Sequence, residues 1–139
     1  MPPPAGMTCL RSRHGASETM ERLVAAVAAK GMTIFVRIDH GAGAAEAGLA
    51  LRPTALLVFG HARSGTPLMQ AAQTAGIDLP LKVLVWQDGD EAVWVGFNEP
   101  DWIADRHGLT PDSVPAVQAM HAALVGIGHE AAGTAESPA

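Results

Sequence analysis

Three segments of this chain, residues 54–60, 81–87 and 92–97, carry apolar side chains at both odd and even positions. Successive residues of a β-strand point to opposite faces of a sheet, so each segment predicts a strand that is apolar on both faces. Asp88-Gly89, between the last two segments, is typical of a hairpin turn. An antiparallel sheet with one face in water alternates apolar with polar residues. Both faces of this sheet are therefore expected to be covered.

The second face could be covered in two ways. The segments 42–53 and 65–80 of the same chain could fold over it, or a second copy of the chain could pack against it. A large exposed apolar patch usually marks an interaction surface. We therefore expect a homodimer that packs in part through the second face of the sheet.

Periodicity and capping signals predict the remaining helices and strands. Two more strands are expected at residues 7–13 and 32–39, long helices at 17–30 and 113–127, and short helices at 41–47, from 66 onward, and at 101–107. The order is strand, helix, four strands with short helical insertions, helix, which predicts an α+β domain over residues 7–128. The ends, 1–6 and 133–139, are small, polar or proline-containing and are expected to be flexible.

Side-chain chemistry also makes predictions about individual positions. Ser17 is expected to be the N-cap of the first long helix, and Thr66 the N-cap of a short helix with Pro67 at its first position. Strict alternation places four residues on one face of the second strand: Met32, Ile34, Val36 and Ile38. Helical spacing places five residues on the inner side of the last helix: Val114, Val117, Met120, His121 and Leu124.

Composition excludes several classes of protein. The formal net charge is −5, and no run of Lys or Arg is present, so a nucleic-acid partner is not expected. The single Cys9 leaves no internal disulfide and no cysteine-rich zinc site. No apolar run approaches the roughly 20 residues of a membrane span, and the N-terminus lacks the pattern of a signal peptide. A cytoplasmic protein without a membrane partner is expected.

Asp39 and His40 form the first candidate site. They follow the second strand and precede Gly41, where a glycine allows a close approach of backbone to ligand. A carboxylate beside an imidazole suits proton transfer or metal binding. The alternative is structural: His40 caps the following short helix while Asp39 pairs with Arg37 or Arg52.

A second candidate site lies between a strand end and a helix start, at His61, Arg63, Gly65 and Thr66. Free N–H groups of a first helical turn, a hydroxyl and a guanidinium would together form an anion site. The alternative is ordinary capping chemistry with a solvated Arg63.

Other polar residues carry weaker signals. Asn98, at the end of the fifth strand, is expected to hold a turn and is grouped with the ligand-binding candidates. No pair of histidines has metal-ligand spacing, so no metal site is predicted unless residues distant in sequence, such as His40, His61 and His107, converge. The sequence identifies no cofactor and no catalytic nucleophile.

Several motifs resemble the domain of unknown function 302 family of small bacterial and archaeal proteins. They run in a fixed order from residue 36 to residue 86 and include Val36-Arg37-Ile38-Asp39-His40-Gly41, Gly65-Thr66-Pro67-Leu68-Met69, Asp78-Leu79-Pro80-Leu81-Lys82 and Leu84-Val85-Trp86. The resemblance implies a TATA-box-binding-protein-like fold, with one antiparallel sheet and two long helices on one face. It also implies a homodimer, and it assigns no activity.

Three functions remain open from the sequence. The first is a homodimeric binding or sensing module for a small, possibly anionic, ligand. The second is an acid–base enzyme that uses Asp39 and His40, and the third is a protein-interaction module that docks through the sheet face.

Overall fold

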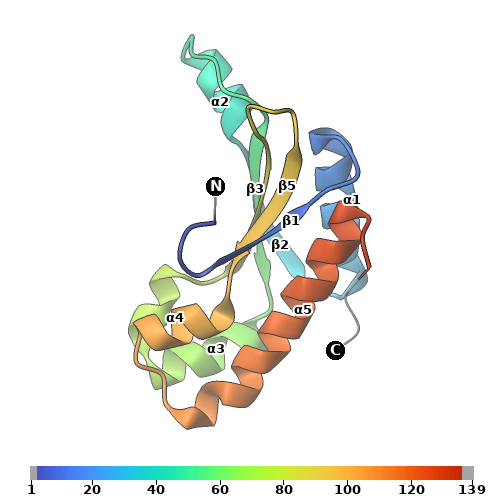
Figure 1. Ribbon diagram of the computed structural model, residues 1–139. Coiled ribbons are helices and arrows are strands. Elements are labelled where there is room, and N and C mark those ends of the chain that lie inside the picture. Colours follow the sequence, from blue (N-terminus) through green and yellow to red (C-terminus); the bar gives the residue numbers. More distant parts are fainter. Residues whose placement is uncertain (1–2, 136–139) are drawn as a thin grey trace.

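The computed structural model describes residues 3–135, which form one five-stranded antiparallel sheet with helices (Figure 1). The strands lie in the order β1-β5-β4-β3-β2. Their bounds are β1 Met7–Arg11, β2 Thr33–Asp39, β3 Thr54–Gly60, β4 Leu81–Gln87 and β5 Val93–Asn98. The predicted α+β class and single five-stranded sheet are therefore confirmed.

Two long helices, α1 (Ala16–Ala29) and α5 (Val114–Ala132), pack side by side against one face of the sheet (Figure 1). Between them and the sheet lies the hydrophobic core. Its fully buried members in these two helices and the three central strands include Leu23, Val27, Leu57, Phe59, Val83, Val95, Phe97, Leu124 and Ile127.

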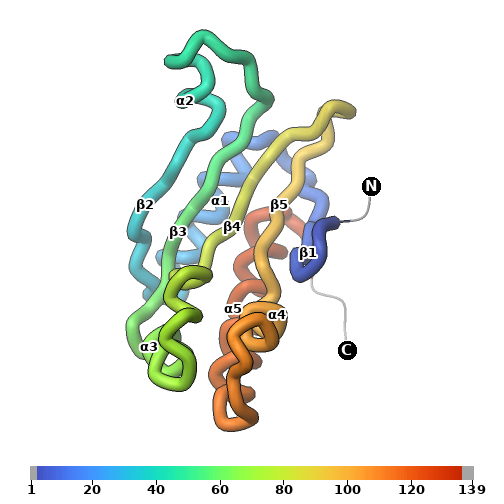
Figure 2. Tube along the Cα trace, turned by 90° about the vertical axis from the view of Figure 1, so that its left-hand side faces the viewer, coloured from blue at the N-terminus to red at the C-terminus, as the bar shows by residue number. Residues whose placement is uncertain are grey.

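The opposite face of the sheet, which we call the open face, is turned toward the viewer in Figure 2. Among the described residues, no helix lies across the middle of its strands. The register places five large apolar residues there, all half-buried: Leu56, Val58, Leu84, Trp86 and Trp94. Segments 42–53 and 65–80 do not cover this face, because the first projects past the end of the sheet and the second packs near the start of α5.

An irregularity in β2 overturns the predicted strict alternation. The register with β3 shifts between Ile34, which is opposite Phe59, and Val36, which is opposite Val58. Directly paired residues share a face, so Ile34 lies on the helix side and Val36 on the open face. The extra residue, Phe35, is accommodated by this β-bulge, which the sequence pattern did not reveal.

The first long helix begins two residues earlier than expected. Gly15, not Ser17, is the N-cap of α1, and no side chain caps it. Ser17 is the second residue of the helix, so its hydroxyl cannot act as the predicted cap. The end of the helix follows the prediction, because Gly31 has φ +72°, the left-handed conformation that glycine adopts most readily.

The third helix also differs from the prediction. α3 spans Ala62–Ala71 with His61 as its N-cap, so Thr66 is not a cap and Pro67 lies inside the helix. The ring nitrogen of His61 accepts a hydrogen bond from the backbone N–H of Arg63, a cap that Ser, Thr, Asp or Asn would ordinarily provide. A 3-10 helix, η1 (Gln73–Ile77), follows and leads into β4.

The hairpin between β4 and β5 is confirmed, although its turn is longer than the predicted Asp88-Gly89 pair. The carboxylate of Asp88 accepts from the backbone N–H groups of Asp90 and Ala92, and Glu91 has φ +66°. The Asp88 carboxylate also accepts from Trp94 Nε1 at 2.8 Å. Asp88 therefore organises a five-residue loop that the dipeptide alone does not specify.

The last three helical segments complete the fold. α4 spans Pro100–Arg106, η2 spans Pro111–Ser113, and α5 continues to Ala132, five residues past the predicted end. Val117, Met120 and Leu124 are buried as predicted, but Val114 is 47% exposed and His121 is exposed. His121 instead pairs with Glu99 at 2.7 Å, so it belongs to the outer side of the helix.

The segment between β2 and β3 projects beyond the end of the sheet (Figure 1). It contains the short helix α2 (His40–Glu46) and the residues up to Pro53, and we call residues 40–53 the arm. Gly48 follows α2 with φ +76°, so the helix ends close to the predicted limit at residue 47.

Candidate functional site

A cavity of about 350 Å³, which we call the main cavity because its lining is the more apolar of the two described below, lies between the start of β2, helix α3 and helix α5. Its lining is mostly apolar and includes Met32, Phe35, Met69, Leu79, Pro80, Met120 and Ala123. Polar groups come from one side only, where α3 and its cap contribute His61, Ser64 and Thr66. This is the usual constitution of a small-molecule site, an apolar pocket with a few polar groups that fix orientation.

The cap of α3 determines what His61 can offer to a ligand. Its Nδ1 accepts from the N–H of Arg63 at 3.1 Å, so the neutral ring carries its proton on Nε2. The carbonyl of His61 accepts from the N–H groups of Ser64 and Gly65. The backbone donors expected to bind an anion are thus already bonded to His61, and the ring N–H and side-chain hydroxyls are left as the cavity's donors.

The residues predicted to form the sites fall into separate groups. His61, Gly65 and Thr66 line the main cavity, whereas Arg63 is exposed and is absent from its lining. Asp39 and Gly41 line a second cavity, of about 430 Å³, beside the start of α1. His40 is exposed and lines neither of these two cavities, and Asn98 lies at the end of β5 opposite Met7. The structure therefore does not assemble them into one site.

The second cavity holds charged groups that already have partners. Asp39 caps α2, with Oδ1 accepting from the N–H of Ala42 at 2.9 Å. Arg37 donates from a terminal guanidinium nitrogen to Glu21 Oε1 at 2.9 Å. Asp39, and not His40, is thus the cap, and the carboxylate is paired with backbone instead of with an arginine.

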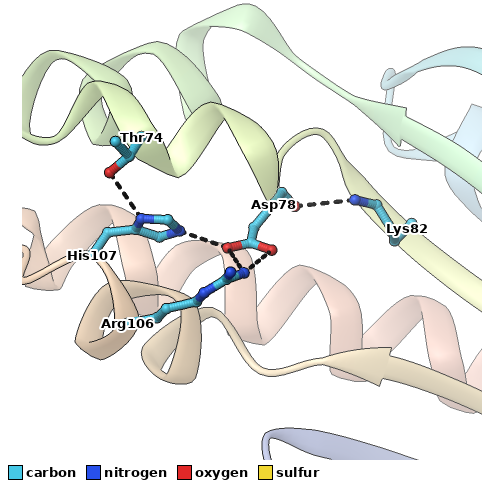
Figure 3. Close-up of polar contacts among 5 residues, drawn as sticks. All are labelled: Thr74, Asp78, Lys82, Arg106 and His107. Atoms are coloured by element: carbon cyan, nitrogen blue, oxygen red, sulfur yellow. Dashed lines mark hydrogen bonds and ion pairs between the residues drawn. The ribbon is translucent and has the colours of Figure 1, made fainter.

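A polar cluster joins η1 to the end of α4 (Figure 3). Asp78 Oδ2 lies 2.6 Å from His107 Nε2, and both carboxylate oxygens lie 2.9 Å from one guanidinium nitrogen of Arg106. Thr74 Oγ1 is 2.9 Å from the other ring nitrogen of His107, and Lys82 Nζ donates to the Asp78 carbonyl. The side chain of His107 is only 7% exposed and that of Asp78 is 13% exposed.

Electrostatics fixes the protonation pattern of this cluster. Burial acts to raise the pKa of Asp78, but the hydrogen bond from His107 and the charge of Arg106 outweigh it, so the pKa lies below its ordinary value. The ionised carboxylate can only accept, so His107 donates from Nε2. In neutral His107 the other nitrogen, Nδ1, accepts the hydroxyl proton of Thr74.

The cluster supports one wall of the main cavity. Asp78 directly precedes Leu79 and Pro80, which line the cavity, and Arg106 and His107 tie Asp78 to α4. The sequence analysis named His107 only among three distant histidines and did not pair it with Asp78. Asp78 lies in a segment that resembles the family, but no periodicity connects it with a residue 29 positions away.

Among residues 3–135, no group of three or more His, Cys, Asp or Glu side chains is placed to hold a metal ion. In the same part of the chain, none of the helices combines the length and apolarity needed to span a bilayer.

Comparisons with known proteins place the chain in a family. The profile described as "Domain of unknown function DUF302" matches residues 8–127. A solved structure of an uncharacterized conserved DUF302 protein from Bacillus stearothermophilus superposes with a TM-score of 0.81 at 17% identity, over 91% of this chain and 98% of that one. At that identity the likeness establishes the fold alone.

Two curated relatives are similar in sequence. The protein named fluoride-specific ion channel FluC 1 from Brucella suis biovar 1 (strain 1330) is 48% identical over 116 residues, which are 84% of this chain and 46% of that protein. The FluC 1 protein of Brucella abortus biovar 1 (strain 9-941) is also 48% identical over 84% of this chain, and 43% of that protein is covered. This chain thus spans less than half the length of these relatives.

Proposed function

This chain belongs to the DUF302 family, and on that premise we propose that it is a homodimeric binding module for a small molecule. The observation that carries the proposal is the cavity between β2, α3 and α5. Its volume of about 350 Å³ falls within the range typical of ligand pockets, roughly 300–1,000 Å³.

The lining indicates the chemistry of the ligand. Met32, Phe35, Met69 and Met120 offer apolar and polarisable surface that adapts to a flat or branched hydrocarbon group. The His61 ring and the hydroxyls of Ser64 and Thr66 offer donors at one end. A compact apolar molecule with one acceptor end, such as a small aromatic carboxylate, fits this arrangement better than a fully hydrated anion.

A pair of substitutions on α5 tests the cavity. Ala123 lines the cavity and is half-buried, whereas the neighbouring Ala122 is exposed and does not line it. Ala123→Phe should fill the cavity, and Ala122→Phe should leave it empty. The probe is a panel of small aromatic carboxylates, measured by thermal shift and calorimetry.

A ligand at about 100 times its dissociation constant stabilises the folded state by about 2.7 kcal/mol, so the wild-type protein and Ala122→Phe should show a clear rise in melting temperature. Ala123→Phe should lose that rise. Equal responses in all three proteins would place binding outside the cavity, and no response in any of them would reject this ligand class.

The homodimer is supported by the distribution of exposed apolar side chains. Phe35, Val36 and Ile38 of β2 are 55%, 43% and 37% exposed, and the open face beside them is apolar. Burial of apolar surface is the main driving force of most protein association. Sedimentation at micromolar concentration should therefore show a dimer, and a monomer alone would refute this part of the proposal.

A second candidate function follows from the names of the relatives. Since proteins named fluoride-specific ion channels contain a segment 48% identical to this chain, we infer a module that works beside such a channel and responds to fluoride. Sodium fluoride should then raise the melting temperature, while sodium chloride at equal ionic strength should not. Identical effects of the two salts would reject the fluoride response.

A further inference from the structure

Large exposed apolar side chains are concentrated on one edge of the molecule. Nine are found among the described residues, and six of them lie in β2 and the arm: Ile34, Phe35, Val36, Ile38, Leu49 and Leu51. By contrast, the large apolar residues in the middle of the open face are half-buried. The edge therefore exposes more apolar surface per residue than the face predicted from the sequence as the dimer contact.

Within residues 3–135, strand β2 is an outer strand of the sheet and pairs only with β3. All seven of its residues are exposed. An outer strand presents a row of backbone N–H and C=O groups that can pair with another strand, so long apolar edges favour association. From Val36 to Asp39 the ladder with β3 is regular, which leaves four residues in ordinary strand geometry.

We propose that a second copy of this chain pairs antiparallel along β2, with the twofold axis at Ile38. This inference rests on the homodimer of the proposed function and specifies its interface. Residues directly opposite each other in an antiparallel pair point to the same side of the sheet. A twofold axis between two copies of β2 must therefore pass through a residue, and the two central residues of this segment give two possible registers. The axis passes either through Arg37, which puts two like charges opposite each other, or through Ile38.

Charge complementarity selects the register at Ile38. Arg37 of each copy then lies opposite Asp39 of the other, and Ile38 meets Ile38. Both charged residues lie on the helix side of the sheet, because they pair with Leu57 and Ala55. Both side chains keep atoms that can form this pair. The cap of α2 uses Oδ1 of Asp39, which leaves Oδ2, and the ion pair with Glu21 uses one guanidinium nitrogen of Arg37, which leaves the others.

The same register explains the exposed arm. Beyond Asp39, the chain of one copy runs toward Phe35 of the other, because the two strands are antiparallel. Leu49 and Leu51, 68% and 51% exposed, are thereby carried toward the partner's exposed apolar residues. Phe35 also lines the main cavity and lies against Gly60, so the partner's arm would lie beside the ligand site.

Opposite charge reversals test the register. Arg37→Asp gives a copy with two acidic residues at the interface, and Asp39→Arg gives one with two basic residues. Each variant alone should sediment as a monomer, or its dimer should have a dissociation constant at least tenfold higher than that of the wild type. An equimolar mixture of the two variants should form a mixed dimer. Arg11→Asp, the same reversal on the opposite edge of the sheet in β1, should leave the dimer unchanged.

A cysteine crosslink provides a measurement that does not depend on charge. In a Cys9→Ser background, Ile38→Cys places the two introduced cysteines directly opposite each other. Their Cα atoms would lie about 4.5–5.5 Å apart, which is within the range of a disulfide. Mild oxidation should yield a covalent dimer. The matched control is Leu56→Cys, which lies beside Ile38 on the neighbouring strand and should remain uncrosslinked.

The outcomes separate this inference from the function on which it rests. A dimer that persists in both charge variants, with no crosslink at Ile38→Cys, would overturn the β2 interface and leave the homodimer in place. A wild-type monomer would overturn both. Ligand binding by the wild type that is lost in Ala123→Phe would still support the cavity in either case.

Discussion

Asp78 and His107 lie 29 residues apart in the sequence, yet the carboxylate Oδ2 of one is 2.6 Å from Nε2 of the other. The contact joins the end of η1 to the end of α4 and fixes the turn that carries Leu79 and Pro80 into the wall of the main cavity. Arg106, the neighbour of His107 at the end of α4, donates to both oxygens of the same carboxylate. A short polar cluster thus determines the position of an apolar wall.

Removing the charge of Asp78 should destabilise the fold. Asp78→Asn loses the ion pair with Arg106 and leaves His107, which is 7% exposed, with a weaker partner. Leaving a buried polar group poorly satisfied costs about 1–3 kcal/mol, and urea unfolding should show a loss of that size. Asp105→Asn, an exposed change on α4, is the control and should have little effect. Equal stability of the two variants would show that the cluster contributes nothing.

The low pKa of Asp78 predicts how its contribution depends on pH. Because the folded-state pKa lies below the unfolded value of about 4, the unfolded chain binds more protons in that window and stability falls as pH falls. The stability difference between wild type and Asp78→Asn should therefore be fully present above about pH 5 and shrink below about pH 4. Urea midpoints measured across this range provide the check, and a difference that grew on acidification would contradict the assigned direction.

Much of the fold follows from local signals in the sequence. The bounds of β3 and β4 coincide with the apolar segments, and Gly31, Gly48 and Gly108 end helices with positive φ, as their positions indicate. The predicted caps of α1 and α3 were wrong because both helices begin before the hydroxyl residue, α1 after Gly15 and α3 after His61, whose ring takes the place of a hydroxyl cap. A β-bulge leaves no mark in a run of apolar residues, so the faces of β2 were partly wrong as well.

The sites were less accessible to sequence reasoning than the fold. Residues adjacent in sequence, such as Asp39 and His40, do not share a site. The strand ends between them, and of the two only Asp39 lines the second cavity. Residues far apart, such as Asp78 and His107, meet because β4, β5 and α4 return the chain to the same place. The apolar lining of the main cavity comes from β2, α3 and α5, and no single segment carries its pattern.

Two glycines should respond in opposite ways to substitution by alanine. A Cβ at Gly96 would lie 2.8 Å from the ring of Trp86, whereas a Cβ at Gly43 would meet no described atom within 4 Å. Gly96→Ala should cost about 1–3 kcal/mol by forcing Trp86 out of place, with a change in tryptophan fluorescence. Gly43→Ala, inside α2, should gain roughly 0.5–1 kcal/mol because glycine is a poor helix former. A neutral Gly96→Ala would show that the Trp86 ring moves freely on the open face.

Asp39 offers a test that separates a structural from a functional role. Its Oδ1 accepts from the N–H of Ala42, so Asp39→Ala should lose the cap of α2 and cost about 1 kcal/mol. Asp39→Asn keeps an oxygen in the same place and should retain most of that stability, because asparagine is an equally good cap. His40→Gln changes an exposed side chain outside both cavities and serves as the control for stability and for the response to ligand. If Asp39 acts only as a cap, Asp39→Asn should also keep the dimer and the response to ligand. A normal fold with weakened self-association in Asp39→Asn would instead show that the negative charge, and not the cap, is what the second copy requires.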